Sequence, residues 1–351
     1  MTPDALVLSP STVPDPMDAP PLRWGVLGPG GIARTFTQAV HAGTRSRVVA
    51  IGSRSAERAT DFAASHGVER SHASYDDLVA DPDVDAVYVA TPHSEHHEHA
   101  LLALRAGKPV LVEKAFTRNL AETEEVLHVA ESVGKLAAEA MWSRYLPQYD
   151  VVRRTVKAGT LGEVVAVEAD HGQLLWPDGP QRLSDPALAG GALLDLGVYP
   201  VSFADHVLGG LTNVTARGTL SDRGVDVTTT IQGLSPDGPE GSSRALAHLW
   251  CTMAAASPCT ARVVGTRARV ELTGRFYSPG PVRLVAPDES VIDQWLPGAT
   301  AHGFRFEVAE FARALALGHL QTWSMPWDAT RRVMTVMDEV RRQIGVRYPG
   351  E

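Results

Sequence analysis

The residues best suited to chemistry lie in an apolar stretch, GGALLDLGVYP, at positions 190–200. Two glycines open it, and the apolar run that follows contains one acid, Asp195, and one phenol, Tyr199. Four residues is just over one α-helical turn, so both side chains are expected on one face of a helix over about 191–208. A carboxyl and a phenol on one face could exchange protons with a ligand. The alternative is a helix acid and a boundary tyrosine.

A glycine-rich turn near the N-terminus lies between a predicted strand, residues 22–27, and a predicted helix, residues 32–42. Its spacing, Gly-x-Gly-x-x-Ala, is that of a dinucleotide-binding fingerprint. In this motif the glycines let backbone N–H groups approach a pyrophosphate at the helix N-terminus, and the alanine keeps helix and strand close. The alternative is an ordinary glycine-rich turn. The cofactor-binding residues expected here are Gly28, Gly30, Gly31, Ile32 and Ala33.

The next predicted strand, residues 47–51, ends at Gly52-Ser53-Arg54. An acid at position 53, which lies 20 residues beyond Ala33, would bind the ribose 2′-hydroxyl of NAD. The serine and arginine found here instead suit a 2′-phosphate, because they offer a hydroxyl and a guanidinium. We therefore expect NADP(H) to be preferred, with NAD(H) possible, and Arg58 to belong to the same site. The alternative is that Arg54 is a solvated charge at a strand end.

Strands and helices alternate through the first half of the chain. Further strands are predicted at 84–92, 109–114 and 135–140, with helices between them. The alternation indicates an α/β fold with a doubly wound parallel sheet, in which ligands bind beyond the carboxyl ends of the strands. The residues expected at those ends are Thr91, Pro92, His93, Glu113 and Lys114.

The histidine-rich run HSEHHEH, at 93–99, could in principle ligate zinc. Helical spacing, however, distributes its four histidines over more than one face, and the sequence offers no evident second set of ligands. We therefore expect no metal site. His93 and His96 are the two histidines expected to face the pocket.

After about Pro147 the regular alternation stops. The strands expected there indicate an α+β domain with a large, mostly antiparallel open sheet, and they lie at 162–172, 245–254, 261–274 and 282–287. Little sequence is left to cover the outer face of such a sheet, so a homo-oligomer is expected. Two amphipathic C-terminal helices are expected to pack back on the first domain, at about 304–316 and 329–344.

The expected domains follow from these patterns. Residues 1–21 are proline-rich and contain no basic residue, so they are expected to form a disordered tail. A nucleotide-binding Rossmann domain is expected over 22–147, and an α+β substrate and oligomerisation domain over 148–351.

Composition limits the partners of the chain. It has 351 residues and a formal net charge of −9, so it lacks the basic surface that nucleic acid or an anionic membrane requires. No apolar run approaches the roughly 18 residues of a membrane span. The two cysteines, Cys251 and Cys259, are few for a secreted protein of this size and favour the cytoplasm.

Several motifs, in order, resemble the Gfo/Idh/MocA oxidoreductases from about residue 22 to the end of the chain. They are GPGGIA, TPHSEHHEHALLALRAGKPVLVEKAFT, EAMWSRYLP, GGALLDLGVYP and GFRFEVAEFARAL. EAMWSRYLP together with Tyr199 is most similar to the branch of dimeric dihydrodiol dehydrogenases and NADP-dependent D-xylose dehydrogenases. The resemblance also implies a homodimer or a higher homo-oligomer.

The resemblance implies roles for particular residues. Lys114 matches the family's active-site lysine, Asp195 matches the acid of its Gly-Gly…Asp motif, and Tyr199 matches a position that is tyrosine in this branch. The chain departs from the family's Glu-Lys-Pro motif at Ala115, which frees φ and restores an N–H after the lysine. The expected substrate-pocket residues are Trp142, Arg144, Tyr145 and Trp176, and the alternative for Trp176 is an interface or core aromatic.

These roles imply hydride transfer between a nicotinamide and a carbinol or ketone carbon of a sugar, polyol or cyclic diol. A base must take the hydroxyl proton, and a neighbouring lysine would favour a phenolate over a phenol of ordinary pKa about 10. Asp195 would orient Lys114 or accept a substrate hydroxyl. Two other functions stay open: a redox-neutral, NAD-dependent glycoside hydrolase of the same fold, and a non-catalytic NADP-sensing regulator.

Overall fold

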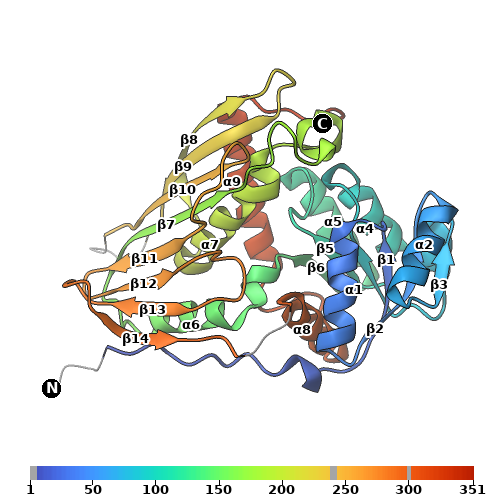
Figure 1. Ribbon diagram of the computed structural model, residues 1–351, viewed down its shortest axis with the longest axis horizontal. Coiled ribbons are helices and arrows are strands. Elements are labelled where there is room, and N and C mark those ends of the chain that lie inside the picture. The colour runs from blue at the N-terminus through green and yellow to red at the C-terminus, as the bar shows by residue number, and fades with distance from the viewer. Residues whose placement is uncertain (1–5, 238–242, 299–301) are drawn as a thin grey trace. The chain divides into compact units, whose positions relative to one another are not determined.

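The structure, a computed structural model, describes residues 6–237, 243–298 and 302–351 (Figure 1). These residues form two compact units, each with its own sheet. The first unit contains residues 14–145 and 302–331, and the second contains the described residues of 6–13, 146–298 and 332–351. The chain therefore passes between the units several times, where the sequence suggested a single boundary near residue 147.

The strands of the first unit form one parallel sheet in the order β3-β2-β1-β4-β5-β6. They are β1 (Arg23–Leu27), β2 (Arg47–Gly52), β3 (Arg70–His72), β4 (Ala86–Val89), β5 (Val110–Glu113) and β6 (Ala137–Ala140). The order reverses between β1 and β4, the switch point at which a Rossmann sheet binds its ligand. The expected doubly wound sheet is confirmed, and we call this part of the protein the Rossmann unit.

Helices pack against both faces of this sheet through two separate apolar cores. They are α1 (Gly31–Gly43), α2 (Ala56–His66), α3 (Tyr75–Ala80), α4 (His96–Arg105), α5 (Leu120–Val133) and α8 (Phe304–Ala316). In one core, Trp24 of β1 contacts Phe36 of α1 and Phe311 of α8. The helix predicted at 304–316 is therefore confirmed as α8, and its apolar face belongs to the Rossmann unit.

The second unit contains an eight-stranded sheet in the order β14-β13-β12-β11-β7-β10-β9-β8, and we call it the sheet unit. Its strands are β7 (Val164–Gly172), β8 (Thr212–Leu220), β9 (Asp226–Leu234), β10 (Leu246–Thr252), β11 (Ala261–Gly265), β12 (Arg269–Leu272), β13 (Val282–Val285) and β14 (Val291–Trp295). Neighbouring strands are antiparallel except β7 and β10. The predicted large, mostly antiparallel sheet is confirmed, although the sequence did not indicate β8, β9 or β14.

One face of this sheet is covered by α7 (Val198–Leu208), which packs against β7 and β10 (Figure 1). The helix predicted over 191–208 is not α-helical throughout, because Leu193–Gly197 forms a π turn before α7 begins. Two further helices contribute to the unit: α6 (Pro147–Lys157) and the part of α9 (Trp327–Ile344) from residue 332 onward.

The N-terminal segment has defined contacts from residue 6 onward, where the sequence predicted a disordered tail. The N–H of Leu8 donates to Asp293 Oδ2 at 2.9 Å, that of Ser9 to Thr155 Oγ1 at 2.9 Å and that of Thr12 to Asp150 Oδ2 at 2.7 Å. Polar side chains of the sheet unit thus satisfy the backbone N–H groups of Leu8, Ser9 and Thr12, which lie outside any helix or strand. Residues 1–5 of the predicted tail lie outside the described residues.

One helical stretch among the described residues, Pro186–Leu208, is long and apolar enough by composition to cross a membrane. The sequence analysis expected no such run. In the structure 89% of its most apolar window is buried inside the protein, as in the core helix of a folded domain. Burial against the sheet therefore explains the length and hydropathy of this stretch.

Candidate active site

The glycine turn lies between β1 and α1, at the switch point of the parallel sheet. Gly28 has a φ of +96°, and a Cβ added to it would lie 3.0 Å from Thr91 Cγ2 and 3.1 Å from the Ala90 carbonyl oxygen. Only glycine lets the turn pass this close to the end of β4. Gly30 is the N-cap of α1, so the first turn of α1, beginning at Gly31, offers backbone N–H groups to a phosphate.

The two residues that follow the glycines fix α1 on the sheet. Ala33 is fully buried in the apolar core, and Ile32 is partly buried against the same core. A larger side chain at position 33 would push α1 away from β1, which is the reason the fingerprint requires a small residue there. The turn therefore has the shape that a dinucleotide pyrophosphate needs.

Arg54 lies at the end of β2, beside Tyr75 and His99. Burial raises the pKa of the Tyr75 phenol, and the nearby Arg54 guanidinium acts against that rise. The ring of Tyr75 packs edge-on against His99, with 4.5 Å between ring centroids, and His99 Nδ1 is 3.0 Å from Thr91 Oγ1. Arg54 therefore belongs to a polar group at the carboxyl edge of the sheet.

Ser53 is a buried residue of the same edge. Its Oγ accepts the N–H of Ser55 at 3.1 Å, which leaves the hydroxyl proton to donate elsewhere. Arg58 lies one helical turn into α2, with an exposed side chain. These residues can offer a hydroxyl and two guanidinium groups to one anionic ligand.

Lys114 follows β5 directly, and its backbone is fixed from two sides. His93 Nε2 lies 3.2 Å from the Lys114 carbonyl oxygen, and the Lys114 N–H donates to Glu113 Oε2 at 3.1 Å. The other oxygen of Glu113 accepts a short hydrogen bond from the Tyr88 hydroxyl. The peptide bond between Lys114 and Ala115 is cis. Glu113 thus positions the lysine backbone from inside the sheet.

His96 connects the ends of β4 and β5. Its Nε2 is 2.9 Å from the Thr91 carbonyl oxygen, and its Nδ1 is 2.9 Å from the Ala115 carbonyl oxygen. Burial lowers the pKa of His96 to about 4, and the hydrogen bonds to the two carbonyl oxygens act against that lowering. Pro92, between these strand ends, is the N-cap of the short helical turn His93–Glu95.

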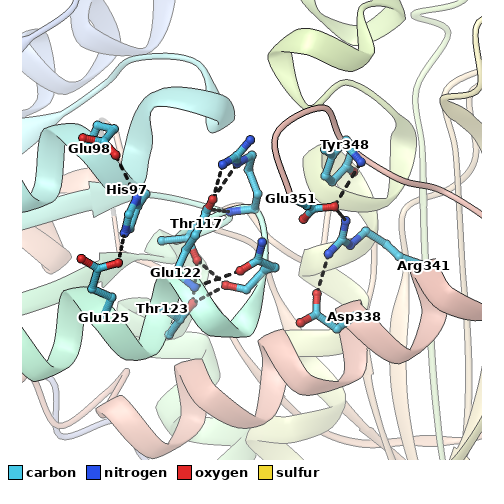
Figure 2. Close-up of polar contacts among 12 residues, drawn as sticks. His97, Glu98, Thr117, Glu122, Thr123, Glu125, Asp338, Arg341, Tyr348 and Glu351 are labelled. Carbon is cyan, nitrogen blue, oxygen red and sulfur yellow. Dashed lines mark hydrogen bonds and ion pairs between the residues drawn. The ribbon is translucent and has the colours of Figure 1, made fainter.

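The remaining histidines of the run have separate partners, as helical spacing predicts. His97 lies between Glu98, at 3.5 Å, and Glu125, at 3.0 Å (Figure 2). Burial and the charge of Arg54 lower the pKa of His99 to about 4. Among the residues that the structure describes, three or more histidine, cysteine or acidic side chains are nowhere grouped to hold a metal ion.

The loop after Lys114 ends in a tightly bonded N-terminus of α5 (Figure 2). Asn119 is the N-cap, and its Oδ1 accepts the N–H of Glu122 at 2.9 Å. The Thr117 hydroxyl donates to the Asn119 carbonyl oxygen at 2.8 Å, and Glu122 Oε2 accepts the N–H of Arg118 at 3.0 Å. These contacts limit the freedom of the segment that follows the lysine.

Asp195 lies inside the π turn of the sheet unit and is 7% exposed. Its Oδ1 is 3.2 Å from both Nη atoms of Arg182, which comes from the short 3-10 helix Gln181–Ser184 before the glycines. The side chain of Arg182 is 42% exposed, so one face of this ion pair reaches solvent. The pair places a carboxylate and a guanidinium together at the surface of the helix.

Tyr199, in the first turn of α7, packs among aromatic rings of the sheet unit. Its ring centroid is 5.1 Å from that of His171 and 5.0 Å from that of Tyr277. Gln173 Nε2 donates to His171 Nε2 at 2.9 Å, so His171 Nδ1 carries the proton and donates to the Leu196 carbonyl oxygen at 3.2 Å. His171 therefore holds both the ring of Tyr199 and the backbone of the π turn.

The four predicted pocket residues differ in how deeply they are buried. Tyr145 is 1% exposed, and its hydroxyl is bonded to the Glu139 carbonyl oxygen and to Thr322, so it is a core residue of the Rossmann unit. Arg144 is also buried, with Nε 3.3 Å from the Ser324 carbonyl oxygen.

The two tryptophans are the more accessible members of the predicted pocket. Trp142 stacks on Phe304, with ring centroids 4.9 Å apart, and is partly buried in the Rossmann unit. Trp176 is partly buried against a small core of the sheet unit that includes Leu183 and Met253. We keep both tryptophans as candidate substrate contacts and leave out Tyr145.

Two family descriptions match the chain. The first, "Oxidoreductase family, NAD-binding Rossmann fold", matches residues 22–140, and the second, "GFO/IDH/MocA C-terminal domain", matches residues 149–271. The chain belongs to the GFO/IDH/MocA oxidoreductase family. The first match lies within the Rossmann unit and the second within the sheet unit, and the resemblance drawn from the motifs is confirmed.

Relatives within the family are named dehydrogenases and reductases. The chain is 33% identical to trans-1,2-dihydrobenzene-1,2-diol dehydrogenase of Bos taurus, over 93% of this chain and 98% of the relative. It is 34% identical to D-xylose 1-dehydrogenase (NADP(+)) of Hypocrea jecorina, over 93% of each. A 3-ketoreductase from Actinomadura kijaniata, solved with NADP and TDP-benzene, superposes with a TM-score of 0.80 at 32% identity, covering 93% of this chain and 98% of that one.

Three residues around the π turn were missed by the sequence analysis. Arg182 gives no periodic signal, because it lies in a 3-10 helix of only four residues, Gln181–Ser184. Tyr277 lies in a loop between β12 and β13. His171 offered a usable signal, since β7 ends in the polar residues Asp170 and His171 and is followed by Gln173. A strand that ends in side chains able to donate and accept protons is typical of a site at a sheet edge.

Proposed function

We propose that this protein is an NADP-dependent dehydrogenase or reductase that acts on a carbinol or ketone carbon of a sugar, polyol or cyclic diol. The observation that carries the proposal is the glycine turn at the switch point, with Lys114 at the end of a neighbouring strand. A dinucleotide cradle beside a lysine side chain suits redox chemistry at a carbon–oxygen bond. The family membership and the names of the relatives support the same class of reaction.

NADP(H) is the proposed cofactor, and NAD(H) is a possible substitute. Ser53, Arg54 and Arg58 offer a hydroxyl and two guanidinium groups where an NAD enzyme has an acid. The xylose dehydrogenase relative is named for NADP(+), and the similar 3-ketoreductase was solved with NADP. Residues 28–33 would hold the pyrophosphate, and Thr91, Pro92, His93, His96 and Glu113 would shape the pocket beyond it.

The bound cofactor would accept a hydride in oxidation and deliver one in reduction. In oxidation, the substrate hydroxyl would pass its proton to Tyr199 while the carbon–hydrogen bond breaks. In reduction, Tyr199 would return that proton to the new alkoxide oxygen. Lys114 would favour the phenolate form of Tyr199 through its positive charge, and Asp195 would bind a substrate hydroxyl.

A homo-oligomer, most simply a dimer, belongs to the same proposal. The face of the sheet opposite α7 carries Leu246, which is 45% exposed, and the partly buried Trp250 on β10. An open sheet face with such residues needs a partner to bury them. Light scattering at micromolar concentration should return twice the mass of the chain, and the mass of a single chain would contradict this part of the proposal.

A cytoplasmic location is also proposed. Cys251 and Cys259 are both buried and both unpaired, which suits a reducing compartment.

The experiment that tests the function is a screen of NADP⁺ and NAD⁺ reduction with aldoses, inositols and dihydrodiols. We expect NADPH absorbance to appear with at least one of these substrate classes and to be weaker with NAD⁺. Release of sugar from a glycoside without net NADPH formation would favour a redox-neutral hydrolase. Tight NADPH binding with no turnover of any substrate would favour a cofactor-sensing regulator.

A further inference from the structure

The π turn that carries Asp195 is anchored at its start by a buried acid of the sheet. Asp226, the first residue of β9, is 0% exposed, and its Oδ2 accepts the N–H of Leu193 at 2.7 Å. Thr229 Oγ1 donates to the same oxygen at 3.2 Å. An acid that is distant in sequence thus accepts an N–H that the first turn of a helix leaves without an intrahelical partner.

The second glycine of the motif makes room for this acid. Gly191 has a φ of +120°, and a Cβ added to it would lie 2.2 Å from Asp226 Oδ1. Neither the backbone conformation nor the space therefore admits a side chain at position 191. The close approach of the Asp226 carboxylate therefore explains the second of the two glycines that open GGALLDLGVYP.

The end of the π turn is held as closely as its start. A Cβ added to Gly197 would lie 2.9 Å from Cys251 Sγ of β10, so the turn lies directly on the sheet. His171 of β7 donates to the Leu196 carbonyl oxygen at 3.2 Å. Asp195 thus lies between two fixed points, and both are supplied by strands beneath the helix.

Burial raises the pKa of Asp226 to about 6, and the N–H of Leu193 and the Thr229 hydroxyl act against that rise. Two titratable groups near Asp226, the Cys251 thiol and the Tyr348 phenol, are neutral at pH 7. Burial raises the pKa of both groups, and the charge of Asp226 raises it further. Tyr348 comes from the C-terminal segment, where Arg341 lies over its ring and pairs with Asp338 and Glu351 (Figure 2). Asp226 therefore depends on neutral donors, chiefly the start of the π turn.

We propose that Asp226 is a positioning residue for the reaction: by holding Leu193 it fixes the π turn and thereby the directions in which Asp195 and Tyr199 point. This inference rests on the proposed function, because it assigns value to the placement of those two side chains. A displacement of about 1 Å in a reacting group can lower turnover about 10²-fold, so a backbone anchor can matter to the rate without touching the ligand.

The test uses Asp226→Ala, Asp226→Asn and Gly191→Ala in the full chain, with kcat and KM measured on a substrate found in the screen. Alanine removes the acceptor, and we expect kcat to fall about 30- to 100-fold. Asparagine keeps one carbonyl oxygen that can accept the Leu193 N–H, so we expect most of the activity to return. The KM for NADP⁺ should stay within about twofold of wild type, because the cofactor residues belong to the Rossmann unit.

The matched control is Asp205→Asn. Asp205 is a buried acid on α7, 4% exposed, that pairs with Arg332 at 2.6 Å and lies beyond the segment fixed by Asp226. Its substitution should lower the thermal midpoint and leave kcat within about twofold. Equal loss of kcat in the Asp205 and Asp226 variants would show general destabilisation and overturn the proposal.

The remaining outcomes separate this inference from the proposed function. If Tyr199→Phe is inactive but the Asp226 and Gly191 variants turn over like wild type, Asp226 is not a positioning residue and the function stands. If Tyr199→Phe turns over like wild type, Tyr199 does not carry the proton, and the role proposed for that residue is wrong. If Asp226→Ala does not fold, the Asp226→Asn and Gly191→Ala variants are measured in its place. A fall in kcat of at least threefold in Gly191→Ala supports the role of Asp226 as an anchor of the π turn, and a smaller change contradicts it.

Discussion

The cofactor edge of the Rossmann unit and the π turn of the sheet unit position their side chains in opposite ways. At the cofactor edge, residues 28–33 form one continuous turn, and the other groups come from the ends of β2, β4 and β5 in the same parallel sheet. At the π turn, Asp195 and Tyr199 are close in sequence, but the groups that hold them or the backbone beside them come from the short 3-10 helix Gln181–Ser184 and from strands β7 and β9.

The difference bears on how each region should respond to change. A turn of contiguous residues depends mainly on its own glycines, so substitutions elsewhere should affect it little. A helix end that is held by three distant segments should lose activity through many substitutions, including some that never touch a ligand. Cofactor affinity and turnover should therefore separate in mutants of this protein.

Tyr199→Phe should give the largest effect and the clearest separation. The substitution removes one oxygen and keeps the ring that packs on His171 and Tyr277, so the thermal midpoint should hardly change. We expect kcat to fall by about 10² to 10⁴, the usual range for loss of a general acid or base, while NADPH affinity persists. The measurements are kcat, NADPH titration and thermal midpoint.

Two companion variants sharpen this result. Lys114→Ala should be similarly damaging, and the double mutant should be much less than additive, because the two groups would act as one unit. Asp195→Asn should lower kcat less, since it would bind the substrate without carrying the proton. Turnover within about threefold of wild type for Tyr199→Phe would remove Tyr199 from the mechanism.

Arg54→Ala tests the other side of the comparison. Loss of a charge-assisted hydrogen bond should weaken NADPH binding by roughly 1.5–3 kcal/mol, or about 10- to 150-fold, and leave NADH binding nearly unchanged. The control is Arg47→Ala, because Arg47 is an arginine at the opposite end of the same strand. Equal weakening of both cofactors by Arg54→Ala would contradict the assignment of the 2′-phosphate site.

The sequence predicted the parts of the fold whose signals are local. The order strand, glycine turn and helix located the switch point, and the apolar periodicity of α8 gave its bounds as Phe304–Ala316. Alternating strands and helices were enough for a parallel sheet, because right-handed connections leave few other arrangements. The candidate residues of the cofactor edge followed from the same signals.

Features that depend on distant contacts were not predictable in this way. The π turn results from Asp226 and from the close approach of Gly197 to Cys251, and neither contact changes the spacing of apolar residues. Tyr145 was expected in the substrate pocket because an aromatic residue near a motif looks functional, but it is a core residue with a bonded hydroxyl. The order in residues 6–21 depends on acceptors such as Asp150, which are far along the chain.

Arg182→Met should have an intermediate effect and tests whether the π turn depends on its neighbouring loop. The variant keeps the apolar stem and leaves the nearly buried Asp195 without the guanidinium 3.2 Å away. Because Arg182 is partly exposed, we expect kcat/KM for the substrate to fall only about 3- to 10-fold, with part of the loss restored in Arg182→Lys. The measurement is steady-state turnover at saturating NADP⁺.

Arg153→Met is the matched control for that variant. Arg153 is comparably exposed, at 47%, and it pairs with the mostly buried Asp150 on α6, far along the chain from the π turn. Its loss should leave kcat/KM unchanged. Wild-type turnover in Arg182→Met would show that Asp195 keeps its function without this partner, and would reduce the contrast between the two regions.

The smallest expected effect concerns stability. It tests whether the stability of the Rossmann unit, unlike the shape of its glycine turn, depends on residues that are far apart in the sequence. Glu139 of β6 is 1% exposed, and burial raises its pKa to about 7, although the Thr330 hydroxyl donates to it at 2.9 Å. Glu310 of α8 is held in the same way, with burial raising its pKa to about 7. Buried acids from two segments that are distant in sequence therefore lie in the interior of the Rossmann unit. Its glycine turn, by contrast, is built from consecutive residues.

The direction of the pH effect follows from the protons bound in each state. An unfolded glutamate has a pKa near 4.5, so between about pH 4.5 and 7 the folded protein holds a proton on Glu139 that the unfolded chain has released. The free energy of unfolding therefore falls as pH rises through this window. A glutamine at position 139 cannot ionise. The Glu139→Gln variant should therefore keep the part of the free energy of unfolding that wild type loses through Glu139, which is about 1 to 3 kcal/mol.

Thermal midpoints of wild type and Glu139→Gln, measured from pH 4.5 to 8, give the test. The thermal midpoint of Glu139→Gln should rise relative to that of wild type as pH rises. The thermal midpoint of Glu57→Gln, a variant on the exposed side of α2, should follow that of wild type throughout. Kcat should stay close to wild type in both variants, because neither residue contacts the proposed ligands. Parallel curves for wild type and Glu139→Gln would mean that Glu139 titrates alike in the folded and unfolded chains, and that the buried acids do not make the stability of the Rossmann unit depend on pH.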